Sequence, residues 1–284
     1  MNSNIDQLHH TMSARDGDDV ELAKLIEDWR TDTINDETYR LKFVFLPNII
    51  KEWMREYGGL QGKELLDFGC GEGTTAIGMA LRMHPKRVVG VEVQPHLLER
   101  CLPIAQAQLR LARLPFNLEL RRIEPGSLHD PRDRFDLIYS WSVFEHIDRG
   151  LLPGILKQLR GALKPNGLLF VQIAPLYYSA EGSHMMPWIP EPWGHLLDQH
   201  SVYCDKLRAN THDDAEFQSQ WSTYRSLNRV TADELVEMAR TTGFEVLRDY
   251  RTKDEREVPA RLLALYLKDT VTTNQVVLLL RPLV

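Results

Sequence analysis

Three glycines and one carboxylate stand at a spacing that suits cofactor chemistry. Gly69, Gly71 and Gly73 occupy alternate positions directly after the apolar run Leu65–Phe68, and Glu92 ends the next apolar run. Glycine adopts positive φ and leaves room for a ligand against the peptide groups and the start of a following helix. An acid about twenty residues beyond such a turn accepts hydrogen bonds from ribose hydroxyls in nucleotide-binding folds. The pattern therefore predicts a nucleotide-type cofactor site.

Neighbouring residues narrow the kind of cofactor. The turn lacks a phosphate-binding lysine, which excludes a P-loop. Thr74 stands where the dinucleotide fingerprint requires glycine, so a pyrophosphate cofactor is disfavoured and a nicotinamide enzyme is the third interpretation. Each residue alone also has a structural explanation: the glycines as turn formers, Asp67 as a helix cap and Glu92 as a solvated acid. Their joint spacing favours the cofactor site.

Four segments, in this order, resemble the class I S-adenosylmethionine-dependent methyltransferases. They are LLDFGCGEG (65–73), VVGVEV (88–93), FDLIYSWSVFEHI (135–147) and LKPNGLLFVQ (163–172). The resemblance extends over residues 40–175 and continues in outline from Leu227. It departs from the family at 124–127, EPGS, where the family often has an acid near the adenine amine.

The resemblance implies S-adenosylmethionine as the cofactor. Asp67 is expected near the methionine amine, Glu92 on the ribose, and Ser140 and Trp141 beside the sulfonium end. The complete set of expected cofactor-binding residues is Asp67, Gly69, Cys70, Gly71, Gly73, Glu92, Val93, Ser127, Ser140 and Trp141. In this family a helix that precedes the first strand can close over the cofactor, which makes Tyr39 and Arg40 further candidates, with core packing and a surface charge as the alternatives.

The elements that must position these residues follow from alternating strand and helix patterns. They predict an α/β fold: a Rossmann-like seven-stranded, mostly parallel sheet with helices on both faces and an inserted cap after the fifth strand. A helix is expected between residues 37 and 57, interrupted near Pro47. The expected division is a polar N-terminal tail with a helix (1–36), a cofactor-binding core (37–175), the cap (176–230) and a C-terminal completion of the core (231–284).

Composition agrees with a protein of the cytoplasm. The chain has 284 residues, 43% of them hydrophobic and 26% charged, and a net charge of -6. An acidic balance without a basic stripe argues against nucleic acid as the main partner. The three cysteines form no disulfide or metal pattern, and the sequence lacks both a secretion signal and an apolar run long enough for a membrane span. The cap is also a candidate contact for a homodimer.

The cap carries the candidate acceptor residues. Methyl transfer to oxygen requires a base for the hydroxyl proton, and histidine suits this task near neutral pH. His184 and His195 lie in the cap and His146 follows the fourth strand, with Glu145 as the runner-up base. Each histidine has a structural alternative. The expected substrate-binding residues are Tyr177, Trp188 and Trp193, where the tryptophans either stack on a sugar or aromatic acceptor or pack the cap. No metal site is expected, because close ligand spacing is absent.

The FEHI and GSHM segments are similar to those of bacterial methyltransferases found with polysaccharide genes. The sequence therefore favours O-methylation of a sugar, glycan or other small hydroxylated acceptor. One alternative is N- or O-methylation of an aromatic or amine metabolite. Another, of a different class, is a non-catalytic S-adenosylmethionine-binding scaffold, which the intact glycines and Glu92 disfavour.

Overall fold

The computed structural model describes residues 33–128 and 133–283. Most of the polar segment 1–36, with its expected helix, lies outside the described residues. Within those described, no helix is both long enough and apolar enough to cross a membrane.

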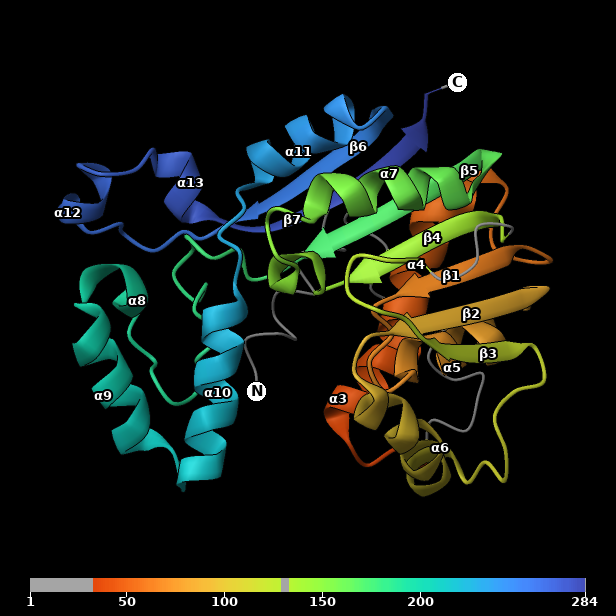
Figure 1. Ribbon diagram of the computed structural model, residues 1–284, viewed down its shortest axis with the longest axis horizontal. Coiled ribbons are helices and arrows are strands. Elements are labelled where there is room, and N and C mark those ends of the chain that lie inside the picture. The colour runs from red at the N-terminus through yellow and green to blue at the C-terminus, as the bar shows by residue number, and fades with distance from the viewer. Residues whose placement is uncertain (1–32, 129–132, 284) are drawn as a thin grey trace. The chain divides into compact units, whose positions relative to one another are not determined.

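The described strands form one seven-stranded sheet in the order β3-β2-β1-β4-β5-β7-β6 (Figure 1). The strands are β1 Glu64–Phe68, β2 Arg87–Glu92, β3 Leu118–Arg122, β4 Phe135–Trp141, β5 Leu163–Ile173, β6 Phe244–Lys253 and β7 Thr273–Pro282. Strand β1 pairs in parallel with β2 and β4, and β2 pairs in parallel with β3, whereas β6 runs antiparallel to β7. This confirms the predicted seven-stranded, mostly parallel sheet.

Contacts divide the described residues into two units. The N-terminal unit comprises 33–128, 133–140 and 161–170, and the C-terminal unit comprises 141–160 and 171–283. The helical segments of the N-terminal unit are α3 Glu37–Arg40, η2 Leu41–Phe45, α4 Leu46–Met54, η3 Arg55–Tyr57, α5 Thr74–Arg82 and α6 Pro95–Leu109. Those that begin in the C-terminal unit are η4 Phe144–His146, α7 Leu152–Ala162, α8 Gly194–Leu197, α9 His200–Asn210, α10 Asp214–Ser226, α11 Ala232–Thr241, α12 Ala260–Leu263 and α13 Lys268–Thr272.

The predicted interruption at Pro47 is a π-helical turn rather than a break. Segment η2 precedes α4, and Pro47 stands at the start of α4. Proline has no N–H for the carbonyl four residues earlier, that of Phe43. The Arg82 guanidinium donates to the Phe43 and Val44 carbonyl oxygens, at 3.3 and 2.9 Å. Gly78 allows α5 to pack closely against this turn, since a Cβ at position 78 would lie only 2.4 Å from the Phe43 carbonyl oxygen.

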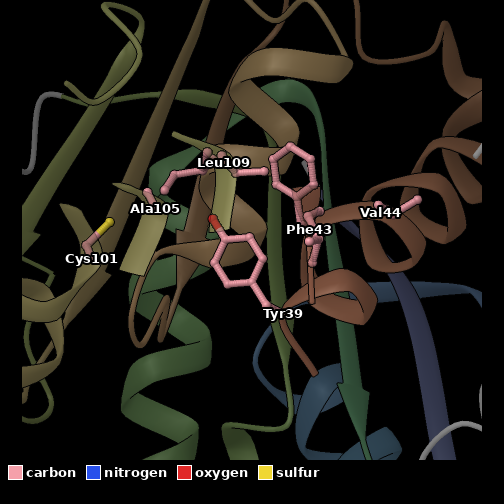
Figure 2. Packing of buried hydrophobic residues seen from close by; sticks show 8 residues of the cluster. Tyr39, Phe43, Val44, Cys101, Ala105 and Leu109 are labelled. Atoms are coloured by element: carbon pink, nitrogen blue, oxygen red, sulfur yellow. The ribbon is translucent and has the colours of Figure 1, made fainter. Parts of the chain in front are cut away.

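A buried apolar cluster joins this helical segment to α5 and α6 within the N-terminal unit. Its members are Ile34, Tyr39, Phe43, Val44, Ile77, Cys101, Ala105 and Leu109. Figure 2 shows the Tyr39 and Phe43 rings close together, with centroids 6.0 Å apart and planes inclined by 20°. The Tyr39 hydroxyl is buried without a hydrogen-bond partner among the described residues. Tyr39 therefore occupies the core position that was its structural alternative, and Arg40 donates to the Ile34 carbonyl.

In the C-terminal unit, the segment expected as a cap is helical and aromatic. Helices α9 and α10 lie side by side (Figure 1). Their core includes Tyr177, Tyr203, Phe217 and Tyr224. Helix α11 then begins at the predicted cap, because the Thr231 and Glu234 side chains bond each other's backbone N–H in a capping box.

Candidate functional site

The glycine turn leaves one side of its backbone uncovered. Gly69, Gly71 and Gly73 all have positive φ, at 80°, 55° and 72°. A Cβ built on Gly71 meets no heavy atom within 4 Å, whereas one on Gly73 would lie 2.7 Å from the Cys101 sulfur. Gly73 therefore serves close packing, and Gly71 provides an open face beside the start of α5.

Glu92 closes the turn from the end of β2. One carboxylate oxygen accepts the backbone N–H of Gly71 at 3.0 Å. The other accepts the N–H groups of Val93 and Gln94, at 2.8 and 3.0 Å. A carboxylate has about four acceptor positions, so this buried side chain is fixed in orientation and keeps capacity for one further donor.

Asp67 is a buried acid that lacks full hydrogen bonding. Its side chain is 4% exposed, and Oδ2 has no partner among the described residues. Burial raises the pKa of Asp67 to about 8, an effect that the nearby Tyr139 hydroxyl partly offsets. The Glu92 charge raises this pKa further and the Lys42 charge lowers it. A cation bound against Asp67 would satisfy the oxygen and favour its ionised form.

The remaining expected cofactor residues differ in accessibility. Ser140 is fully buried and donates to the Phe68 carbonyl at 2.9 Å, which ties β4 to the end of β1. Cys70 packs against Gly90, and burial raises the pKa of its thiol. Val93 is 38% exposed, Ser127 is exposed after β3, and Trp141 is half-buried. The structure thus brings together Asp67, the glycine turn and Glu92, and places Ser127 at an exposed turn.

Three histidines of the C-terminal unit have hydrogen bonds that indicate where their protons lie. His184 and His195 hold Nε2 against the carbonyl oxygens of Pro175 and Tyr177, at 2.9 and 2.6 Å. A carbonyl only accepts, so Nε2 carries the proton and Nδ1 the lone pair. His146 Nδ1 lies 2.9 Å from the Ser226 hydroxyl.

Burial keeps these rings neutral. It lowers the pKa of both His184 and His195 to about 4, and it also lowers that of His146. His146 and His184 are neighbours, with ring centroids 5.3 Å apart in an edge-to-face arrangement. His195 is only 8% exposed and packs edge-on against Tyr177. His146 and His184 are therefore half-buried neighbours, and His195 is enclosed.

The expected substrate-binding aromatic residues already have partners. Trp193 is 2% exposed and donates its indole N–H to the Val271 carbonyl at 3.0 Å. Trp188 donates to the Glu216 carboxylate at 3.2 Å. Tyr177 is buried, with its hydroxyl 3.4 Å from that of Tyr224. For Trp193 this geometry favours the packing alternative over stacking on a ligand.

Comparison with known proteins identifies the family. Residues 43–249, more than half of the chain, match the family model described as a methyltransferase domain. The chain belongs to the S-adenosylmethionine-dependent methyltransferases.

Relatives of this methyltransferase differ in what they modify. It is 34% identical over 119 residues to the ribosomal protein L11 methyltransferase of Pseudomonas paraeruginosa, covering 42% of this chain and 35% of that protein. It is 29% identical over 164 residues to the ubiquinone biosynthesis O-methyltransferase of Coxiella burnetii, covering 56% and 64%. The matches thus span less than two thirds of either relative. An S-adenosylmethionine-dependent methyltransferase structure from Clostridium acetobutylicum has a TM-score of 0.53 at 13% identity, covering 86% and 92% of the two chains, which shows the shared fold.

The residues of the methyltransferase's N-terminal unit fit the family's cofactor. Asp67 offers an unpartnered carboxylate oxygen for the amine, Glu92 a fixed carboxylate for the ribose, and Gly71 an open backbone face. Their individual contacts with S-adenosylmethionine stay predictions, which this geometry supports. No group of three or more metal-binding side chains occurs within 33–128 and 133–283.

Four residues near these sites were not singled out from the sequence. Lys42 acts on Asp67 from η2, Ser226 holds His146, and Asn228 and Arg229 lie beside the turn after β4. Ser226 and Asn228 reach residues about eighty positions earlier, so no local pattern could have shown them. Glu145, the runner-up base, is 3% exposed, with both carboxyl oxygens lacking partners among the described residues.

Proposed function

We propose that this methyltransferase acts on a hydroxyl oxygen of a small acceptor and that His146 accepts the hydroxyl proton. The hydrogen bonds around His146 carry the proposal. The Ser226 hydroxyl donates its single proton to the Thr223 carbonyl at 2.7 Å, so it accepts a hydrogen bond from Nδ1 of His146. The lone pair of the neutral ring then stands on Nε2. This tautomer gives His146 a defined basic nitrogen, which supports the proposal.

Bound S-adenosylmethionine supplies a methyl group on a sulfonium centre. As the acceptor oxygen forms its bond to that carbon, the carbon–sulfur bond would break with its electron pair going to sulfur, and the acceptor's O–H proton would move to Nε2 of His146. Ser226 stabilises the resulting imidazolium, because Nδ1 continues to donate to it. The lowered pKa of His146 keeps the ring unprotonated at neutral pH, so activity should fall only as the pH decreases through that lowered value.

Sugar or glycan acceptors remain the first class to test. An aromatic hydroxylated acceptor is the second candidate, and Tyr178 favours it. Unlike Tyr177, Tyr178 is only half-buried, and an accessible aromatic ring suits contact with a phenol. Neither tryptophan offers a free indole N–H for a sugar hydroxyl, since both N–H groups are already bonded.

The test is methyl transfer with matched histidine variants. His146→Ala should lower kcat by about a hundredfold or more while leaving the affinity for S-adenosylhomocysteine unchanged. His212→Ala is the control, because the His212 side chain is 91% exposed. Sugars, catechols and amines are assayed in parallel. Transfer to amines alone, or equal turnover in the two variants, would overturn the proposal.

A further inference from the structure

The segment 228–230 is fixed on the turn that carries Glu145 and His146. The Asn228 side-chain amide donates to the carbonyl oxygens of Phe144 and Ile147, at 2.6 and 2.8 Å. Its backbone N–H donates to the Glu145 carbonyl at 2.9 Å, and its side-chain oxygen accepts the Val230 N–H. The residue between these anchors is Arg229, which is therefore held in place by its neighbours on both sides.

Arg229 has an unusual backbone conformation and an uncompensated charge. Its φ is +60°, a region that an arginine without a structural requirement rarely adopts. Its guanidinium lies over the Tyr177 ring, 4.9 Å from the centroid. Among the described residues, no carboxylate forms an ion pair with it. Arg208, which stacks in the same way over Phe217, is paired with Asp214.

The groups that face Arg229 supply no negative charge at neutral pH. The Arg229 charge interacts electrostatically with four side chains that are neutral near pH 7, namely Tyr177, Tyr178, Tyr224 and His195. Burial raises the pKa of Glu145, on the adjoining turn, to about 8, so that carboxyl is mostly protonated. Glu234, an acid on another element, acts on Tyr178 and is itself paired with Arg149. The surroundings of Tyr177 thus carry one net positive charge from Arg229.

We infer that Arg229 binds an anionic group, a carboxylate or a phosphate, of the acceptor that this methyltransferase modifies. The inference rests on the proposed function, which it deepens by specifying the acceptor as an acidic hydroxylated molecule. The exposed guanidinium has donors for two oxygens of such a group, while its stacking on Tyr177 limits the orientations it adopts. The acidic group, held by Arg229, would then position the acceptor relative to His146, because Asn228 anchors the neighbouring residue to the turn that carries His146.

The test compares paired probes that differ by one acidic group, titrated into protein saturated with S-adenosylhomocysteine. The pairs are 3,4-dihydroxybenzoate with catechol, and glucose 6-phosphate with glucose, followed by intrinsic fluorescence and calorimetry. One acidic member at least should bind about tenfold more tightly than its neutral partner, and added salt should reduce the difference. The pair that shows the preference distinguishes a carboxylate from a phosphate.

Variants assign the preference to one residue. Arg229→Gln should abolish it, Arg229→Lys should retain part of it, and Arg208→Gln should leave it unchanged. Thermal unfolding verifies that each variant is folded. The inference is overturned if neither acidic probe binds better than its partner, or if the preference survives Arg229→Gln. A charge preference without methyl transfer to any hydroxyl would instead count against the proposed function alone.

Discussion

The buried Asp67 carboxyl predicts that the cofactor product binds more tightly as the pH rises. Its pKa is raised to about 8 by burial, so the free protein holds a proton there at neutral pH. The α-amino cation of S-adenosylhomocysteine interacts favourably only with the ionised form. Binding must therefore release this proton, and the replacement Asp67→Asn should remove the pH dependence.

The magnitude follows from the fraction that is ionised. With a pKa of about 8, roughly 1% of Asp67 is ionised at pH 6 and half at pH 8. The affinity should accordingly increase about fiftyfold over this interval, which equals about 2.3 kcal/mol, and level off at higher pH. Near pH 7, about 0.9 proton should be released for each molecule bound.

Calorimetry in buffers of different ionisation enthalpy measures both quantities. Asp136→Asn is the matched control, because that carboxyl lies on β4 of the same unit, is bonded to Lys164 and has a lowered pKa. Tyr139→Phe should move the affinity curve to higher pH, since the Tyr139 hydroxyl favours the ionised form of Asp67. A wild-type affinity that is constant between pH 6 and pH 8, or a slope that persists in Asp67→Asn, would refute the reasoning.

Three further predictions concern the turn and the core. Gly71→Val should reduce the affinity for S-adenosylhomocysteine by about a hundredfold or more in a calorimetric titration, because the new side chain fills the open face of the glycine turn. Gly62→Val is the control: its backbone strain is similar, at φ +70°, and it should retain affinity. Glu145 should contribute a loss of stability as the pH rises from about 4 to 8, because its native carboxyl, with its pKa raised to about 8, keeps a proton that the unfolded chain loses. Glu145→Gln should remove that part of the decline, so its melting temperature relative to wild type should increase with pH; a constant difference between pH 5 and pH 8 would contradict this. Arg82→Met should cost about 2 kcal/mol in urea unfolding, since it removes the hydrogen bonds to the Phe43 and Val44 carbonyl oxygens, and a loss below about 0.5 kcal/mol would argue against that role.

The cofactor-binding turn was predictable because its determinants are local. Positive φ at Gly69, Gly71 and Gly73 follows from the residue type, and the position of Glu92 at the end of β2 follows from the length of one strand–helix–strand unit. The sequence could not show that Glu92 also closes the turn through Gly71, because that bond depends on the detailed path of the backbone.

The segment after β5 was predictable only as an aromatic insertion. Tryptophan is used both for packing and for ligand contact, and only the structure shows that the Trp193 indole is enclosed and bonded to Val271. The protonation pattern of His146 depends on Ser226, eighty residues away. The π-helical turn at Leu41–Phe45 was also missed. Its Phe43 and Val44 carbonyl oxygens accept hydrogen bonds from Arg82 of a different helix, which no local pattern shows.

The most direct test of the central claim is to locate the transferred methyl group. S-adenosylmethionine with a trideuterated methyl is incubated with wild-type protein and the panel of hydroxylated and amine acceptors, and each product is analysed by mass spectrometry and NMR. We expect a trideuteromethyl group on an acceptor oxygen and a large loss of that product with His146→Ala. A label found only on nitrogen or carbon, or O-methylation at an undiminished rate in His146→Ala, would contradict it.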